Sequence, residues 1–347
     1  MTSTVGGVGD DGGVEPQPRG RFTVETLLRD VLGSEPGPAA GTGAYPALDE
    51  LVHWFRAECA AIVAGCPPEA APLRLPKARI TDLLSCERGT VARLGGTGLG
   101  EAIVRGRLTD LVVGQHLVDR AASASSPPPV EDVLRDALAA AGEHDLLAWL
   151  DAADDDTAAR LWAHADRTRG HLRRSWGTVP RDWWARTQER ISIDVADGAL
   201  LLAGQFDVAL GGPPTGRPLV VVEVKAGHAA DRHRRDLLWY ALLSALRHGA
   251  LPAVVATWTA EDDGLVPLDV TIGTVEAAAR RGLAALEVLV ELAAGRPAAE
   301  RPHAGCRWCP VLDRCEPGLA SLVRSPTDGT TASGDEWGPP EDDLPWD

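Results

Sequence analysis

Apolar and polar residues alternate along the second half of the chain, and this alternation predicts strands. In "RISIDVADG" the apolar side chains of Ile191, Ile193 and Val195 occupy every second position before a turn at 196–198. The later run "LVVVEVK" is almost continuously apolar, which is typical of a strand covered on both faces. The strands predicted in this way lie at about 189–195, 200–210, 219–225, 252–258 and 265–271.

Helical spacing of apolar residues dominates most of the remaining chain. Predicted helices cover about 46–66, most of 77–180, 229–249 and 274–294, and a proline-rich break is expected at 67–76. Within "RGRLTDLVVGQHLVDR", Leu108 and Val112 define the inward face of a helix, and His116, four residues later, shares that face. Because the predicted strands are interspersed with and followed by predicted helices, we expect an α/β protein.

Composition and pattern divide the chain into six segments. These are a glycine-rich, disordered N-terminus (1–20), a helical N-terminal segment (21–76), a helical part (77–188), an α/β core (189–300), a cysteine segment (301–323) and a disordered acidic tail (324–347). Low hydrophobicity with many glycines or acidic residues is the reason for expecting disorder at both ends.

The net charge of −16 argues against a basic coat protein for nucleic acid, although it leaves room for a local binding site. Seven acidic residues and no basic residue follow Arg324, so much of the excess negative charge lies in the tail. No apolar run reaches the roughly 18–20 residues of a membrane span, and the N-terminus lacks the pattern of a signal peptide. We therefore expect a cytoplasmic protein, in which the six cysteines favour metal binding or redox chemistry over disulfides.

The strand at 219–225 carries the most informative charged residues. Glu223 and Lys225 are two positions apart, so both project from one face of an otherwise apolar strand. Asp207 lies near the end of the preceding strand, and an antiparallel pairing would bring its carboxylate close to that of Glu223. Two carboxylates beside an ammonium group can hold Mg²⁺ or Mn²⁺ and position a water molecule for attack on a phosphodiester.

A surface ion pair at a strand end is the simpler explanation of an E-x-K pattern. That explanation does not account for the use of a lysine here, because the chain has 34 basic residues and only two are lysines, Lys77 and Lys225. An ion pair would accept arginine. A catalytic ammonium would not be replaceable, because guanidinium is bulkier, planar and does not deprotonate. The scarcity of lysine therefore favours a catalytic role for Lys225.

These residues resemble the core of the PD-(D/E)XK nucleases, in the branch that includes the RecB nuclease domain and CRISPR-associated exonucleases. The matching positions are Gly204 and Asp207 in a G-x-x-D strand, Glu223 and Lys225 in a (D/E)-x-K strand, and Tyr240 in a Q-x-x-x-Y helix. Asp236 stands where the family has the glutamine. The resemblance implies a restriction-endonuclease-like core with a mixed central sheet flanked by helices. It also implies a metal site formed by Asp207 and Glu223, with His116 as third ligand, and catalytic roles for Lys225 and Tyr240.

The stretch "CRWCPVLDRC" supplies three close thiolates, those of Cys306, Cys309 and Cys315. Such a group favours a soft metal or a cluster and needs a fourth ligand, for which Cys86 in "ARITDLLSCERG" is the candidate. Both halves resemble the iron–sulfur clasp of the same nuclease branch, which implies a 4Fe–4S cluster that joins the two flanks of the core. Zinc is the rival occupant. Cys59 and Cys66 have no partners at ligand spacing and are expected to be structural.

The resemblance implies a metal-dependent deoxyribonuclease, either an exonuclease or an end-processing enzyme, that acts on single-stranded DNA or DNA with free ends in repair, recombination or defence. One alternative is a nuclease-fold subunit without activity that binds DNA or scaffolds a repair or defence complex. Another is a zinc-clasped regulatory protein. No P-loop motif occurs, so a helicase would be a separate partner. The ending "PPEDDLPWD" either aids solubility or docks a partner protein through Trp346.

Overall fold

The computed structural model describes Thr26, Val31 and residues 46–94, 98–118, 128–177, 179–228 and 231–324. Its α-helices are α2 (Pro46–Val63), α3 (Lys77–Ser85), α4 (Glu87–Arg93), α5 (Glu101–Val118), α6 (Val130–Ala141), α7 (His144–Ala152), α8 (Asp155–Ser175), α9 (Asp231–His248), α10 (Ile272–Ala293) and α11 (Glu316–Arg324). Its strands are β1 (Leu73–Pro76), β2 (Arg186–Val195), β3 (Leu200–Gly212), β4 (Arg217–Lys225), β5 (Val254–Thr259) and β6 (Gly264–Leu268).

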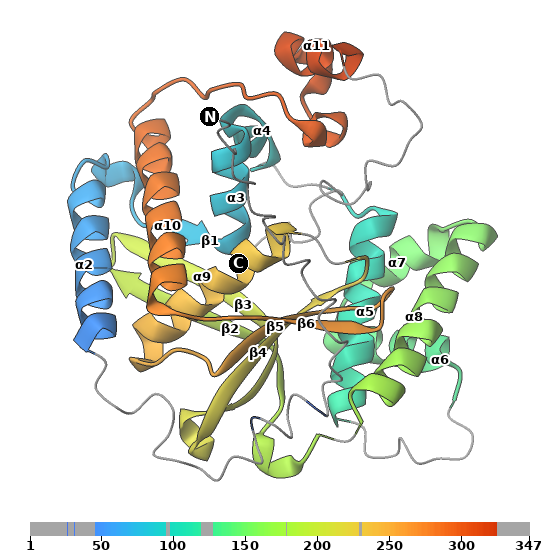
Figure 1. Ribbon diagram of the computed structural model, residues 1–347. Coiled ribbons are helices and arrows are strands. Elements are labelled where there is room, and N and C mark those ends of the chain that lie inside the picture. Colours follow the sequence, from blue (N-terminus) through green and yellow to red (C-terminus); the bar gives the residue numbers. More distant parts are fainter. Residues whose placement is uncertain are drawn as a thin grey trace, which may run out of the picture.

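The six strands form one mixed sheet between two layers of helices (Figure 1). Helices α2, α3, α9 and α10 cover one face, and α5 to α8 cover the other. The strand β4 serves both layers, because Val221 packs into the first core and Val220 and Val222 into the second. This is the α/β, restriction-endonuclease-like arrangement that the sequence predicts, and the continuous apolar run of β4 reflects burial on both faces.

Strand pairing places two different strands along the same edge of β3. Over its first half, β3 pairs in parallel with β1, with Pro76 opposite Ala203. Over its second half it pairs antiparallel with β4, with Val208 opposite Val222. Strand β2 runs antiparallel along the other edge. The strands β1 and β4 therefore point toward each other, and their carboxyl ends meet beside residues 204–207 of β3.

The predicted elements are largely confirmed, with one difference that matters for the site. The proline-rich break expected at 67–76 is wrong for its last four residues, because Leu73 to Pro76 form β1. Prolines suit an edge position, and β1 pairs with β3 alone. The helix expected to close at Gly249 does so, with Gly249 in the left-handed region at φ 65°.

The expectations for residues 1–20 and 325–347, including the docking role of Trp346, lie outside the described residues. None of the helices in the described ranges combines the length and apolar content needed to cross a bilayer.

Candidate active site and cysteine pocket

The candidate active site lies where the carboxyl ends of β1 and β4 meet. Lys77 is the first residue after β1, and Glu223 and Lys225 are at the end of β4. Gly204 and Asp207 belong to the part of β3 between the two strand ends. Residues that are more than a hundred positions apart in sequence are thus brought together by one edge of a single strand.

Both lysines of the chain contact the same carboxylate oxygen. The Nζ atom of Lys77 lies 2.6 Å from Oε1 of Glu223, and the Nζ atom of Lys225 lies 3.0 Å from it. The three residues are buried, with exposed fractions of 8%, 6% and 1% for Lys77, Lys225 and Glu223. A surface ion pair is therefore the wrong explanation of the E-x-K pattern. Burying three charges costs several kcal/mol of desolvation, which is typical of functional rather than purely structural positions.

Asp207 lies beside this ion group, at the point where β3 and β4 are paired antiparallel as the sequence predicts. Its Oδ2 accepts a hydrogen bond of 2.7 Å from the backbone N–H of Val224. Enclosure of the carboxylate by protein raises the pKa of Asp207 well above its usual value, and the charge of Glu223 raises it further. The carboxylate of Asp110 adds to this upward shift in the pKa, while the two lysines oppose it.

Asp110, on α5, is a carboxylate of the site that sequence reasoning missed. The predicted third ligand, His116, is on the same helix, but the structure places its Nε2 3.1 Å from the carbonyl oxygen of Gly177. Asp110 is among the groups that raise the pKa of Asp207. The signal in the sequence was its position, because Asp110 lies between Leu108 and Val112 in the same predicted helix as His116.

Tyr240 and Gly204 fix α9 against the sheet. The ring of Tyr240 packs edge-on against Phe206, with centroids 5.1 Å apart, and Lys77 Nζ lies 5.0 Å from the Tyr240 centroid. A Cβ atom on Gly204 would stand 2.6 Å from Cδ1 of Leu243 and 3.2 Å from Cε1 of Tyr240. The glycine of the G-x-x-D pattern is therefore required by the close approach of α9. Asp236, one turn before Tyr240, lines a small pocket together with Lys77.

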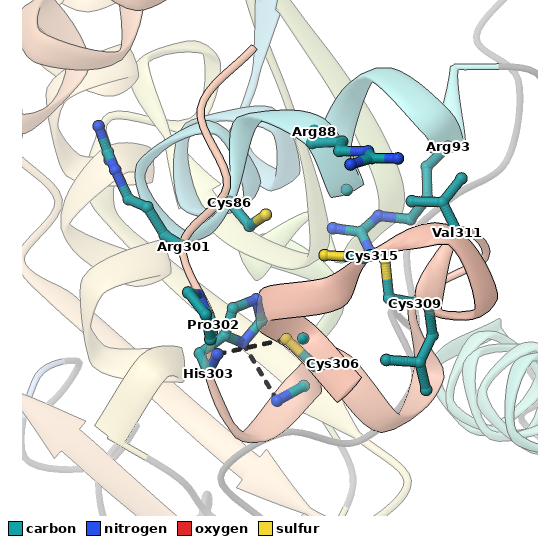
Figure 2. A pocket seen from close by; sticks show the side chains of 14 residues that line it. Cys86, Arg88, Arg93, Arg301, Pro302, His303, Cys306, Cys309, Val311 and Cys315 are labelled. Atoms are coloured by element: carbon teal, nitrogen blue, oxygen red, sulfur yellow. Dashed lines mark hydrogen bonds between the residues drawn. The ribbon is translucent and has the colours of Figure 1, made fainter. Parts of the chain in front are cut away.

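The four predicted cluster cysteines line one pocket, although in the sequence Cys86 precedes the core and the other three cysteines follow it. Figure 2 shows the sulfur atoms of Cys86, Cys306, Cys309 and Cys315 around a common space. A Cβ atom on Gly89 would stand 3.8 Å from Sγ of Cys86 and 3.6 Å from Sγ of Cys309. The absence of a side chain at Gly89 thus leaves the space between these two sulfurs open.

Three arginines border the cysteine pocket, and each is paired with a carboxylate. Arg88, Arg93 and Arg301 line it together with the cysteines, and all four thiols are free. Four soft sulfur donors in one pocket fit a metal or an iron–sulfur cluster.

A polar clamp joins the two flanks of the chain beside the cysteine pocket. The buried carboxylate of Glu87 accepts hydrogen bonds from Arg296 and from the backbone N–H of Ala299, both at 2.8 Å, and from Arg301 at 3.1 Å. Burial acts to raise the pKa of Glu87, but these hydrogen bonds and charges outweigh it and hold the pKa below its usual value. The flanks are therefore held together by contacts that involve no cysteine.

Within the described residues, no group of three or more His, Cys, Asp or Glu side chains is already arranged to hold a metal ion. The two remaining cysteines lie apart from the pocket: burial in α2 raises the pKa of Cys59 to about 12, and Cys66 Sγ contacts the carbonyl of Pro67.

Comparison with known proteins gives a family match and a structural match. A family model described as the PD-(D/E)XK nuclease superfamily matches residues 83–316. The matched range includes the three carboxylates, Lys225 and all four pocket cysteines, and it begins after Lys77. Among solved structures, the crystal structure of SSO0001 is 13% identical over 77% of this chain and 96% of that chain, with a TM-score of 0.31. No curated protein sequence matches the chain.

Proposed function

Because the chain belongs to the PD-(D/E)XK nuclease superfamily, we propose that it is a divalent-metal-dependent nuclease that hydrolyses phosphodiester bonds in DNA. One observation carries this proposal: both lysines of the chain converge on the buried carboxylate of Glu223, next to Asp207. Hydrolysis of a phosphodiester explains why these three charges are buried together despite the cost of their desolvation, whereas a role in folding alone does not explain it.

The residues that would hold Mg²⁺ or Mn²⁺ are Asp207, Glu223 and Asp110. Carboxylate oxygens are the preferred ligands of both ions. The raised pKa of Asp207 reports negative charge that burial and its neighbours disfavour, and a cation would offset it. When bound, such an ion supplies a Lewis acid for the phosphodiester. We propose Asp110 as the third metal ligand. His116, which was predicted as that ligand from the sequence, is compared with it in the experiment below.

The two lysines have different roles in this proposal. Lys225 orients the attacking water and stabilises the negative charge that develops on the phosphate. Lys77 is a positioning residue, because its contact of 2.6 Å holds Oε1 of Glu223 in one place. Tyr240 supports Lys77 through its ring, and Asp236 borders the site from the preceding turn of α9.

The proposal is tested with DNA oligonucleotides labelled at either end, single-stranded and duplex, in Mg²⁺ or Mn²⁺. We expect the wild type to cleave and Asp207→Asn and Glu223→Ala to be inactive while remaining folded. Asp110→Asn should lose at least about 100-fold in rate, as expected for a ligand, whereas His116→Ala should retain activity. The reverse order would restore His116 as the ligand.

We further propose that the enzyme works from strand ends, as an exonuclease or end-processing enzyme in repair, recombination or defence. Circular single-stranded DNA of the same sequence then resists cleavage, and the end that is labelled decides polarity. The substitution of glutamine by Asp236 keeps one alternative open, a nuclease-fold subunit that only binds DNA. Binding without cleavage in both metals, by protein with full metal content, would favour that alternative.

We also propose that Cys86, Cys306, Cys309 and Cys315 hold a 4Fe–4S cluster. The common pocket and the open space at Gly89 support this assignment. Zinc is the rival occupant, because four thiolates suit either. The bound group would tie α4 to the segment after α10 and add stability through binding.

Iron and zinc content of anaerobically purified protein tests the cysteine assignment. We expect broad visible absorption and iron, and loss of both in a serine variant of any of the four pocket cysteines. Cys59→Ser and Cys66→Ser are the matched controls and should retain the metal. Zinc without visible absorption would replace the cluster by a zinc site, and unchanged metal in Cys86→Ser would refute the four-cysteine site.

For partners we propose DNA first and, for the unwinding of duplex ends, a separate helicase or defence-complex protein in the cytoplasm. The acidic ending, residues 325–347, would dock such a protein through Trp346. A peptide of this ending should bind the helicase that copurifies with the full chain, and a Trp346→Ala peptide should not. Equal binding by both peptides would remove Trp346 as the anchor.

A further inference from the structure

A second polar pocket adjoins the candidate active site through Lys77. It is lined by residues of α3, α9 and α10, which belong to one layer of helices (Figure 1). Its lining consists of Lys77, Ile80, Thr81, Arg235, Asp236, Trp239, Ala278 and Arg281. Three of these side chains are basic and one is acidic, in a chain whose net charge is −16. Lys77 lines the pocket and also contacts Oε1 of Glu223 at 2.6 Å. The pocket is therefore adjacent to the carboxylates of the candidate active site.

The walls of this pocket are held rigidly. The indole N–H of Trp239 donates a hydrogen bond of 3.1 Å to the carbonyl of Ala203, which fixes α9 on β3. A Cβ atom on Gly282 would stand 2.7 Å from Cζ3 of Trp239, so α10 approaches α9 closely beside Arg281. The guanidinium of Arg281 reaches across to Oγ1 of Thr81 on α3 at 3.4 Å. Rigid walls that place charged groups in advance are typical of binding sites.

The electrostatics of the pocket favour an anion. Burial lowers the pKa of Arg281, and the neighbouring charge of Arg235 lowers it further, with Asp236 opposing. The partly buried guanidinium of Arg281 thus lies near the exposed one of Arg235, and a bound anion would offset the repulsion between them. Guanidinium groups bind phosphate oxygens in pairs and are the preferred side chains for this purpose.

We propose that the Arg235–Arg281 pocket is a subsite for a phosphate group of the nucleic-acid strand, close to the bond that is cut. The inference rests on the proposed nuclease function and adds where the substrate strand runs: from the carboxylates, past Lys77, over the junction of α3, α9 and α10. The same chemistry would accept an internal phosphodiester or a terminal 5′-phosphate.

Neighbouring arginines on the same helices provide matched controls. Arg280 is next to Arg281 but pairs with Glu276 on the exposed side of α10. Arg234 is next to Arg235 and exposed, and it is not part of the pocket lining. Each control removes the same charge from the same helix, so a general loss of positive charge is separated from a loss of the subsite.

The test measures binding of a labelled single-stranded oligonucleotide by fluorescence anisotropy, without divalent metal, at several salt concentrations. We expect Arg281→Gln and Arg235→Gln each to weaken binding about 5- to 10-fold and to reduce the salt slope by about 0.7, the value for one phosphate contact on a single strand. Arg280→Gln and Arg234→Gln should change affinity less than about twofold. Equal losses in all four variants, or in none, would overturn the subsite.

The melting temperature of each variant checks for a structural role. If Arg281→Gln lowers the melting temperature but binds DNA as tightly as Arg280→Gln, then Arg281 only connects α10 to α3. That result would refute its part in the subsite. Arg235 is exposed, so its variant folds and keeps the test decisive. Because no cleavage is needed, a protein that binds through the pocket but does not cut would refute the nuclease and keep the subsite.

Oligonucleotides with a 5′-phosphate and a 5′-hydroxyl distinguish the two sources of the phosphate. If the loss in Arg281→Gln is confined to the 5′-phosphorylated strand, the subsite holds a terminal phosphate. If both strands lose affinity equally, it holds an internal phosphodiester. Absence of any binding by the wild type to either strand would overturn the proposal.

Discussion

At the scale of single residues, the use of lysine is the feature that best separates function from folding. The chain has 34 basic residues, and its two lysines both contact Oε1 of Glu223. Scarcity directed attention to Lys225 from sequence, and the same reasoning applied to Lys77 would have found the second contact. Lys77 was missed because it follows a strand that sequence patterns did not reveal, so nothing connected it to Glu223.

Replacement of either lysine by arginine should impair cleavage. Lys225→Arg and Lys225→Ala should both lose at least about 100-fold in kcat, because the role proposed for the ammonium group is to stabilise the charge of the transition state. Lys77→Arg should lose about 10- to 100-fold, as is usual for residues that orient a metal ligand, and should need more Mg²⁺ for half-maximal rate. Arg79→Lys, a change of the same kind on α3, is the control. Wild-type rates in Lys225→Arg would show that charge alone suffices.

Removal of the charge of Asp207 should stabilise the metal-free protein. The raised pKa of this carboxyl means that its ionised form is disfavoured in the fold, while an asparagine oxygen can still accept the N–H of Val224. Asp207→Asn should gain about 0.5–2 kcal/mol, as functional-site substitutions often do, and lose the stabilisation by Mg²⁺. Asp194→Asn, whose Oδ1 accepts the N–H of Gly198 on an exposed turn, is the control. A lower melting temperature for Asp207→Asn would contradict this reading.

At the scale of elements, the strands and helices that have a regular apolar pattern could be predicted from the sequence, whereas the pairing of strands could not. The strands β2 to β6 and the helices α2, α9 and α10 were predictable, because burial on one face or both leaves a regular apolar pattern. The four-residue β1 is too short to leave such a pattern. Lys77, which follows it, contacts Glu223 although the two residues are 146 positions apart in the sequence. The third metal ligand predicted from sequence, His116, stays a prediction, and Asp110 on the same helix was not considered, since periodicity identifies the inward face of a helix and not the turn that lies beside β3.

Gly204→Ala tests how tightly α9 is set on β3. The added methyl would meet Leu243 at 2.6 Å and the ring of Tyr240 at 3.2 Å, and such overpacking costs about 1–3 kcal/mol of stability. Cleavage should fall as well, because Tyr240 supports Lys77. Gly106→Ala on α5 meets nothing within 4 Å and should be neutral or stabilising by up to about 1 kcal/mol. Calorimetry and cleavage rates of both variants decide, and unchanged values for Gly204→Ala would mean that α9 moves freely.

At the scale of the whole molecule, the second helical layer is fastened to the sheet by a buried histidine. His164 of α8 contacts Oγ1 of Thr109 on α5 at 3.0 Å and Oε1 of Glu261, in the turn after β5, at 3.2 Å. Burial lowers the pKa of His164 below its usual 6.5, with Arg105 adding to this and Glu261 opposing it. The contact therefore links α5, which carries Asp110, to both α8 and the sheet.

Acidification should loosen this layer. The unfolded chain takes up a proton on this residue near pH 6.5, whereas the folded chain does so only at lower pH, so stability is lost as the pH falls below about 6.5. Melting temperatures between pH 8 and pH 5 should decline less steeply in His164→Gln than in the wild type. His144→Gln, at an exposed position, should keep the wild-type slope. Parallel curves for the wild type and His164→Gln would exclude His164 as the group responsible.

The meeting of β1 and β4 along one edge of β3 also sets the order in which the site is completed during synthesis. Lys77 leaves the ribosome 146 residues before Glu223, an interval of roughly 7 to 30 s at common elongation rates of about 5–20 residues per second. For most of that time, until Leu200 to Ala203 of β3 have been made, β1 lacks the strand with which it pairs. A growing or prematurely ended chain that stops before β4 therefore carries no complete centre and cannot cut the nucleic acid around it.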